Sequence, residues 1–330
     1  EILWYKRKFE LTEEMQKCKT VYLNFLAVDY ECTAYINGQF ALYHEGGYGG
    51  FGCDIRPYLK DGKEQEIELR VYDPMTKIYP RGKQNWQEGR QRCWYYATSG
   101  IWQSVWLSGA QGDYIKSVRF ETDAERTQAC VYAETINGEA DEITAIVKTP
   151  HGGEQKFSST VKKDGRLLLN MSFEKPDCID DIHLWTAEHP KLYETTLQIR
   201  KNGETADEIE TYFAFRKVHT ESGRVYINDR AEELRMVLNQ GYFENSGLTA
   251  PSAESYKNDI LLAKKMGFNG MRIHQKAEDP WLYYYADTLG MYLWAETPSA
   301  YAFTPETTRA TLDLQQQIVK LVYNSPSVIA

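Results

Sequence analysis

Three side chains that can bind polar ligands follow two apolar runs late in the chain. Arg272 and His274 lie at the end of one run, and Glu296 follows the next run, which ends at Trp294. A guanidinium, an imidazole and a carboxylate can together bind hydroxyl groups, and they can also bind one another. Two interpretations therefore stay open: a ligand site, or an internal arrangement in which Arg272 pairs with Glu296 and His274 hydrogen-bonds within its turn.

Parallel strands have to position these residues, because strand-length and helix-length segments alternate after Lys217. Ser252, Asp279-Pro280 and Thr304-Pro305 are typical helix starts. The predicted strands cover residues 235–239, 270–273 and 291–294, and a fourth begins near residue 327. Arg272 and His274 then end the second strand, whereas Gln240 and Tyr242 follow the first, where they could bind a ligand or pack beneath a loop.

The chain before residue 217 has the two-residue period of half-buried β-strands. Ile67, Leu69 and Val71 alternate with polar residues, and Asn37-Gly38 is a typical tight hairpin turn. The first 110 residues therefore predict an all-β sandwich. A second β region, from about residue 113 to residue 216, has the length of an immunoglobulin-like sandwich.

Composition excludes several classes of partner. The formal net charge of −9 and the absence of a long Lys/Arg run argue against binding to nucleic acid or to an anionic membrane. No apolar stretch reaches the roughly 18 residues that a membrane span needs. We expect an uncharged small ligand rather than a nucleic acid or a membrane.

The cysteines indicate neither a metal site nor a disulfide scaffold. Their spacing contains no CxxC pair, so we expect no metal and no cofactor, and free thiols favour a reducing, cytoplasmic compartment. The chain opens on Glu1 rather than methionine, which predicts a truncated N-terminus and leaves a secreted or periplasmic location open. The six cysteines are Cys18, Cys32, Cys53, Cys93, Cys130 and Cys178.

Short strings distributed along the whole chain resemble glycoside hydrolase family 2. The most specific is SGIWQSVWL at residues 99–107, and LWTAEHPKLY at residues 184–193 is similar to the Trp-x-x-x-x-Pro-x-Leu-Tyr string of that family. Two departures are Asp229, where the family usually has Gly, and Asn324-Ser325-Pro326, which replaces the commoner His-Pro. The other matching strings are WYKRKF (4–9), YING (35–38), FRK (215–217), YIND (226–229), MGFN (266–269), RIH (272–274), DTLGM (287–291) and NSPSVI (324–329).

The resemblance implies three domains: a sugar-binding jelly-roll-like domain over residues 1–110, an immunoglobulin-like β-sandwich over residues 111–216, and the first three to four βα units of a (β/α)8 TIM barrel over residues 217–330. A complete barrel usually takes about 250 residues. The third part is therefore expected to be an incomplete catalytic domain.

The resemblance also implies the reaction. Members of the family are typically retaining glycosidases, so the parent protein is expected to be an exo-acting β-galactosidase or β-glucuronidase that binds a carbohydrate substrate. The acid/base Glu, which follows an Asn, and the nucleophile Glu are both expected beyond Ala330. No catalytic residue is therefore assigned within this chain, and the fragment is expected to be inactive.

Substrate-binding residues can be carried over from the resemblance. Arg272 and His274 match the Arg-x-His element beside the sugar pocket, and the place of Glu296 on the third barrel strand favours a ligand or supporting carboxylate over a catalytic acid. By resemblance, the loops that hold Asp73, Lys83 and Gln84 reach towards the barrel mouth. An exposed basic loop that is merely solvated is the alternative for these three.

A second function class stays open beside the hydrolase. The chain could be a non-catalytic carbohydrate-binding or scaffold protein, built from two sandwiches and a vestigial barrel segment. The sequence determines neither the sugar and its linkage nor the oligomeric state, and a homo-oligomeric parent protein is left open.

Overall fold

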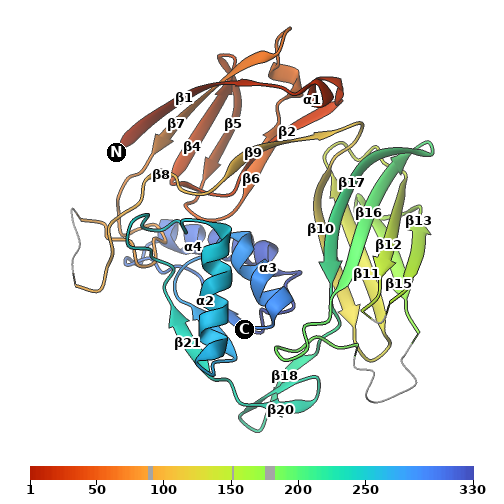
Figure 1. Ribbon diagram of the computed structural model, residues 1–330. Helices are drawn as coiled ribbons and strands as arrows, with labels where there is room; N and C mark the ends of the chain where they lie inside the picture. Colours follow the sequence, from red (N-terminus) through yellow and green to blue (C-terminus); the bar gives the residue numbers. More distant parts are fainter. Residues whose placement is uncertain (88–91, 151, 175–182) are drawn as a thin grey trace.

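The computed structural model describes residues 1–87, 92–150, 152–174 and 183–330. The first part of the chain forms two facing antiparallel sheets, drawn in red to orange in Figure 1. Val21, Leu23 and Leu69 belong to the apolar core between these sheets. One sheet has the strand order β1(Ile2–Glu10)-β7(Glu64–Tyr72)-β4(Glu31–Ile36)-β5(Gln39–Glu45). The facing sheet has the order β6(Phe51–Asp54)-β2(Thr20–Phe25)-β9(Val105–Ala110). Two further short strands, β3(Val28–Asp29) and β8(Gly100–Ile101), pair with each other. A helix α1(Glu13–Lys17) and a 3-10 turn η1(Arg56–Tyr58) complete this part.

The second sandwich packs two four-stranded antiparallel sheets, coloured yellow to green in Figure 1. Its core is almost fully apolar, with Val131, Ile143 and Leu197 completely buried. One sheet has the order β10(Ile115–Asp123)-β11(Gln128–Thr135)-β15(Arg166–Ser172)-β14(Val161–Lys163), and the other β13(Glu154–Ser159)-β12(Glu142–Lys148)-β16(Tyr193–Lys201)-β17(Glu204–Phe213).

The predicted hairpin turns have the backbone that their sequences require. Asn37 and Gly38 join β4 to β5 with φ angles of 51° and 79°, and Asn202 and Gly203 join β16 to β17 with φ angles of 52° and 84°. Two consecutive positive φ angles match the right-handed twist of the flanking strands, and Asn-Gly adopts them at low cost. The prediction of two β-sandwiches is confirmed.

A small antiparallel sheet leads into the last part of the chain: β18(Val218–Glu221), β19(Arg224–Ile227) and β20(Arg230–Glu232). The turn between β19 and β20 contains Asn228 and Asp229, both with positive φ angles, of 50° and 61°. Asp229 therefore has a left-handed backbone conformation. Glycine, the usual residue at this position in the resembling family, adopts that conformation with less strain than aspartate does.

The last part is the predicted parallel β/α segment. Strands β21(Met236–Asn239), β22(Gly270–Ile273) and β23(Tyr292–Ala295) are parallel neighbours in that order. Helix α2(Ala253–Lys265) follows β21, α3(Pro280–Leu289) follows β22, and α4(Pro305–Val322) follows β23. After α4 the chain returns to β23, where Val328 pairs in parallel with Leu293, so the predicted fourth strand begins beside the third.

Two of the three predicted helix caps form as expected. Asp279 accepts a hydrogen bond from Trp281 N and Thr304 accepts one from Thr307 N. Ser252 occupies the cap position of α2, but its hydroxyl lies 3.2 Å from the Ser255 hydroxyl instead of accepting from a helix amide.

The parallel segment packs against both sandwiches. Trp185, which is completely buried, donates from Nε1 to the carbonyl of Asp287 at 2.8 Å. Asn324 accepts from Phe120 N and donates to the carbonyl of Val118, both at 2.9 Å. The Asn324 departure therefore has a structural role, because its amide joins the end of α4 to strand β10 of the second sandwich.

Within the described residues, the five cysteines are free thiols; Cys178 lies outside those residues. No helix in the same part of the chain is both long and apolar enough to cross a membrane.

Candidate functional site

Arg272, His274 and Glu296 meet at the carboxyl ends of β22 and β23. One carboxylate oxygen of Glu296 accepts from Nε of Arg272, and the other lies 2.8 Å from Nδ1 of His274. The backbone amide of Gln275 adds a third hydrogen bond to Glu296, at 3.2 Å. The structure therefore contains the ion pair that the sequence offered as one of two interpretations, and it lies where strand ends would form a site.

The charge state of Glu296 follows from these contacts. Partial burial alone would raise the pKa of Glu296, but the hydrogen bonds from Arg272 and His274 outweigh it and hold the pKa below its usual range. The carboxylate is then ionised at neutral pH and can accept hydrogen bonds but not donate a proton. It orients the two basic side chains rather than acting as an acid.

The arginine end of this cluster is open to solvent. The Arg272 side chain is 43% exposed, whereas those of Glu296 and His274 are 14% and 16% exposed. The Arg272 guanidinium also lies 5.4 Å from the centre of the Trp294 ring, which is itself 44% exposed. A polar ligand with an apolar face can therefore approach Arg272 and Trp294 together.

Gln240 and Tyr242 line a different cavity, of about 420 Å³, along the free edge of β21. Tyr242 stacks on Tyr95 from the first sandwich, with ring centres 4.0 Å apart. Burial raises the pKa of Tyr242, and its hydroxyl has no hydrogen-bond partner among the described residues. The lining of this cavity does not include Arg272, His274 or Glu296, so the structure does not bring these two predicted groups together.

Asp73 is buried in an ion pair with Arg81 within the first sandwich. Its oxygens accept from both Nη atoms of Arg81, at 2.6 and 3.1 Å, and from the hydroxyl of Ser99, at 2.6 Å. The side chains of Asp73 and Arg81 are each 1% exposed. Arg81 is therefore not part of a solvated basic loop, and Asp73 is engaged in supporting that loop.

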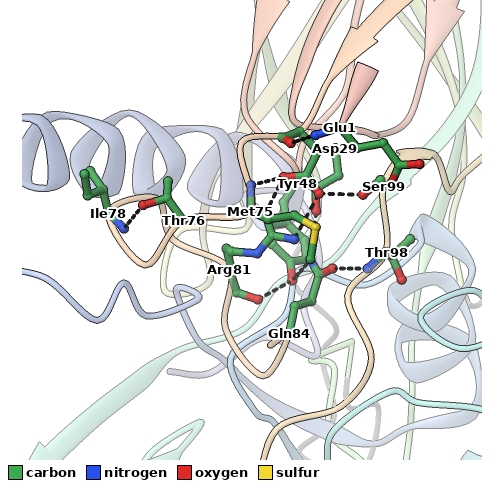
Figure 2. Close-up of polar contacts among 11 residues, drawn as sticks. Glu1, Asp29, Tyr48, Met75, Thr76, Ile78, Arg81, Gln84, Thr98 and Ser99 are labelled. Carbon is green, nitrogen blue, oxygen red and sulfur yellow. Dashed lines mark hydrogen bonds and ion pairs between the residues drawn. The ribbon is translucent and has the colours of Figure 1, made fainter. Parts of the chain in front are cut away.

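Gln84 is also buried. Its Nε2 donates to Asp29 at 2.9 Å, and its Oε1 accepts from the backbone amide of Thr98 at 2.7 Å (Figure 2). Lys83 differs from its neighbours, since its side chain is partly exposed and forms no hydrogen bond or ion pair within the described residues. Of the predicted first-domain residues, Lys83 alone has an uncommitted side chain.

The loop that holds these residues does reach the strand ends. The amide of Gly82 donates to the carbonyl of Ser299 at 3.0 Å, and the Tyr301 hydroxyl donates to the carbonyl of Gly82 at 2.6 Å. The same hydroxyl lies 3.0 Å from Oε1 of Gln275, which bonds Glu296 through its backbone. A chain of hydrogen bonds through Tyr301 and Gln275 thus connects the first sandwich to the Glu296 cluster.

Several of these supporting residues were not predicted. Gln275 has a φ angle of 55°, and Tyr301 bridges two domains far apart in the sequence; no local pattern signals either property. A buried pair, Lys276 and Glu278, follows directly in the same loop, with both side chains only 1% exposed. The described residues contain no group of three or more His, Cys, Asp or Glu side chains that could hold a metal ion.

Comparison with known proteins identifies the relatives. Residues 2–110 match the sugar binding domain of glycosyl hydrolases family 2, and residues 113–216 match a second model of that family. A putative beta-glucuronidase of Formosa agariphila is 28% identical over 99% of this chain, and a beta-galactosidase of Thermoanaerobacter pseudethanolicus is 25% identical over 90% of it. The chain spans 39% of the length of each of these two relatives.

Solved structures share the fold. A beta-glucuronidase of Bacteroides uniformis superposes with a TM-score of 0.81 at 24% identity, over 99% of this chain and 40% of the other. A putative beta-galactosidase of Bacteroides fragilis gives the same TM-score at 21% identity, over 99% of this chain and 49% of the other. With a sugar-binding sandwich, an immunoglobulin-like sandwich and a short parallel β/α segment in this order, the chain belongs to glycosyl hydrolases family 2.

Proposed function

We propose that the chain is the front part of a longer retaining β-glycosidase, of galactosidase or glucuronidase type, and that it supplies the sugar-binding side of the active site. Membership of glycosyl hydrolases family 2 supports the reaction class, and the names of the relatives support the two sugar classes. The domains proposed are residues 1–110, 111–216 and 217–330.

The parallel segment is proposed to begin a TIM barrel. Three parallel neighbours in chain order, each followed by a helix, are the repeating unit of that fold, and the pairing of Val328 with Leu293 starts a further unit. Active sites of such barrels lie at the carboxyl ends of the strands, and Arg272, His274 and Glu296 lie at that face.

The Glu296 network is the observation that carries the proposal. Both carboxylate oxygens are committed to protein donors, so Glu296 fixes the directions of Arg272 and His274. The half-exposed Arg272 guanidinium can then bind a sugar hydroxyl or a uronate carboxylate, while Trp294 offers an aromatic face. The Arg272 guanidinium is thus held in place before the substrate binds. Such a cation beside an aromatic ring suits a sugar, which has polar hydroxyl groups and an apolar face.

Glu296 is not proposed as the acid/base or the nucleophile. A retaining glycosidase needs two free carboxyl groups roughly 5 Å apart, one of which is protonated when the substrate binds. Glu296 is held ionised and fully hydrogen-bonded. We therefore assign the two catalytic carboxylates to later barrel strands of a longer protein.

The remaining predicted residues receive different roles. Asp73 and Gln84 are proposed to hold the first-domain loop against the strand ends, and Lys83, which is partly exposed, is proposed to reach the substrate from that loop. Gln240 and Tyr242 are proposed to shape the neighbouring strand end rather than to contact the sugar beside Arg272.

The test is hydrolysis of nitrophenyl β-galactoside and nitrophenyl β-glucuronide by the product of the complete coding sequence that contains this chain. Because charge-assisted hydrogen bonds are lost, Glu296→Gln and Arg272→Met should each lower kcat/KM by at least about tenfold. Glu254→Gln, which alters an exposed carboxylate on α2 paired with Lys257, is the control and should leave kcat/KM unchanged. Absence of turnover on either substrate would overturn the hydrolase proposal.

A non-catalytic carbohydrate-binding protein is the second candidate, favoured by the match of residues 2–110 to a sugar binding domain. This function predicts saccharide binding by the complete product without any hydrolysis. It also predicts that binding is insensitive to Glu296→Gln.

A further inference from the structure

A cleft of about 670 Å³ opens between β1 and β9, which are edge strands of the two facing sheets in the first sandwich. Both strands are labelled in Figure 1. The apolar part of the lining comes from the core of the sandwich, including Leu23, Leu69 and Leu107. The cleft is therefore an opening into the sandwich itself, between two unpaired strand edges.

Three polar side chains in this cleft are uncommitted. Arg7, Glu10 and Gln103 line it and form no side-chain hydrogen bond or ion pair within the described residues. Arg7 shares the inward face of β1 with Tyr5 and Phe9, a position that is normally apolar. The Arg7 guanidinium is thus available to a ligand.

The cationic residues beside Arg7 have partners, which distinguishes them from it. Lys6 pairs with Glu68 at 2.7 Å, and Lys8 pairs with Glu64 at 2.9 Å. Their charges are compensated by the neighbouring strand β7. Among these three cations, Arg7 therefore has no ion-pair partner within the described residues.

Aromatic rings form the walls of the cleft. Tyr5 and Phe9 project from the inward face of β1. Trp106 of β9 pairs with Asn24 on the outer face of its sheet, so its ring is not one of these walls. An apolar concave site with a few uncommitted polar groups is the usual form of a small-molecule site, and aromatic rings suit the C–H faces of sugars. We propose that this cleft is a second carbohydrate-binding site, in which an oligosaccharide packs on Tyr5 and Phe9 and hydrogen-bonds to Arg7 and Gln103.

The cleft is distinct from the Glu296 cluster. Ile101 and Gln103 line the cleft, whereas Trp102 between them packs with Leu248 and Ala277 of the parallel segment. The cleft and the contact with the parallel segment therefore lie on opposite sides of the same short stretch of chain. The second site does not depend on the proposed hydrolysis.

An added peptide strand fits these edges less well than a sugar does. Charged residues on an edge strand disfavour pairing with another strand, and β1 carries Lys6, Arg7 and Lys8 in succession. A saccharide needs no continuous backbone ladder and can use the same charges as hydrogen-bond donors.

The experiment is calorimetric titration of the chain with two probes, cellotetraose as a neutral oligosaccharide and tetragalacturonate as an acidic one. Phe9→Ala and Arg7→Met should each weaken binding by about threefold to tenfold, because each removes a wall or a donor of the cleft. The control is Trp4→Ala: Trp4 lies on β1 and is 62% exposed but does not line the cleft, so binding should be unchanged.

The two probes report on the ligand. If Arg7→Met weakens tetragalacturonate more than cellotetraose, the guanidinium binds a carboxylate; equal losses mean that it binds hydroxyl groups. Because Arg7 is exposed, Arg7→Met should leave the unfolding midpoint unchanged, which keeps the test valid even if Phe9→Ala unfolds the domain.

Three results would overturn the proposal: no binding of either probe, equal weakening by Trp4→Ala, or abolition of binding by Arg272→Met. The last result would assign the sugar to the strand ends of the parallel segment and not to the cleft. Intact binding in Arg272→Met supports the cleft, whatever the outcome of the hydrolysis experiment.

Discussion

Lys276 and Glu278 form an ion pair 2.9 Å long with both side chains only 1% exposed. Nζ of Lys276 also donates to the carbonyls of Gly241 and Leu248, at 2.6 and 2.7 Å. The ammonium therefore ties the loop after β21 to the loop after β22, directly beside Gln275 and the Glu296 cluster. Burial lowers the pKa of Lys276, and the neighbouring Glu278 carboxylate offsets only part of that shift.

Replacement of Lys276 by methionine should be strongly destabilising. Lys276→Met leaves the Glu278 carboxylate buried without its partner, which typically costs about 3–5 kcal/mol of unfolding free energy. Urea unfolding measures the loss. The matched control is Lys6→Met, which removes an exposed lysine paired with Glu66 and Glu68 and should change stability little. Equal effects of the two substitutions would contradict a structural role for the buried pair.

Gly82 should tolerate no side chain, because the first-domain loop lies directly on the strand ends. Gly82 has a φ angle of 62°, and a Cβ atom there would overlap the carbonyl oxygen of Gln275. Gly138→Ala is the control, since Gly138 has a φ angle of 67° but no atom within 4 Å of the position that its Cβ would take. Both changes add backbone strain of about 1–2 kcal/mol, and only Gly82→Ala should add a clash, giving the larger drop in unfolding midpoint. Similar drops would mean that the loop is not docked.

Local signals in the sequence predicted the elements of the fold well. Asp279-Pro280 and Thr304-Pro305 start helices because a capping side chain and a proline act on adjacent residues, and Asn37-Gly38 forms its turn for the same local reason. Ser252 shows the limit of such a signal, since its hydroxyl contacts Ser255 instead.

Burial of charge was not predictable, because it depends on residues distant in the sequence. Gln84 and Asp73 are residue types that are common in solvated loops. In the structure, however, Gln84 donates to Asp29, which is 55 residues away, and Asp73 forms a buried ion pair with Arg81. The Arg272–Glu296 pair was anticipated as one of two interpretations because parallel strands bring their ends together. No alternation or motif distinguishes the buried Lys276 from an exposed lysine.

Asn324 should hold the second sandwich against the parallel segment. Asn324→Ala removes the acceptor of Phe120 N and the donor to the carbonyl of Val118, which should cost about 1–3 kcal/mol because both partners are partly buried. Hydrogen exchange at the Phe120 amide should accelerate. In Asn24→Ala, which removes side-chain hydrogen bonds inside the first sandwich, exchange at Phe120 should stay at the wild-type rate. Unchanged exchange in Asn324→Ala would show that the contact does not hold the two parts together.

Asp287 should make stability depend on pH. Burial raises the pKa of Asp287 to about 6, although Ser327 and Tyr212 donate to its carboxylate. The ordinary pKa of an unfolded aspartate is about 3.9. The folded protein therefore holds this proton more tightly than the unfolded chain does, so the contribution of Asp287 to stability is complete below about pH 4 and is lost as the pH rises through about 6.

The variant Asp287→Asn cannot ionise, and its amide oxygen can still accept from Ser327 N. Its stability relative to wild type should rise by about 3 kcal/mol between about pH 4 and pH 7, as measured by urea unfolding across that range. In Tyr212→Phe, which removes one donor to the carboxylate, the pKa of Asp287 should rise further and the loss of stability should move to higher pH. A difference in unfolding free energy between wild type and Asp287→Asn that stays constant across the pH range would contradict the prediction, because it would mean that this carboxyl group is solvated in the folded protein. Trp185 and Tyr212 would then not exclude water from the interface around α3.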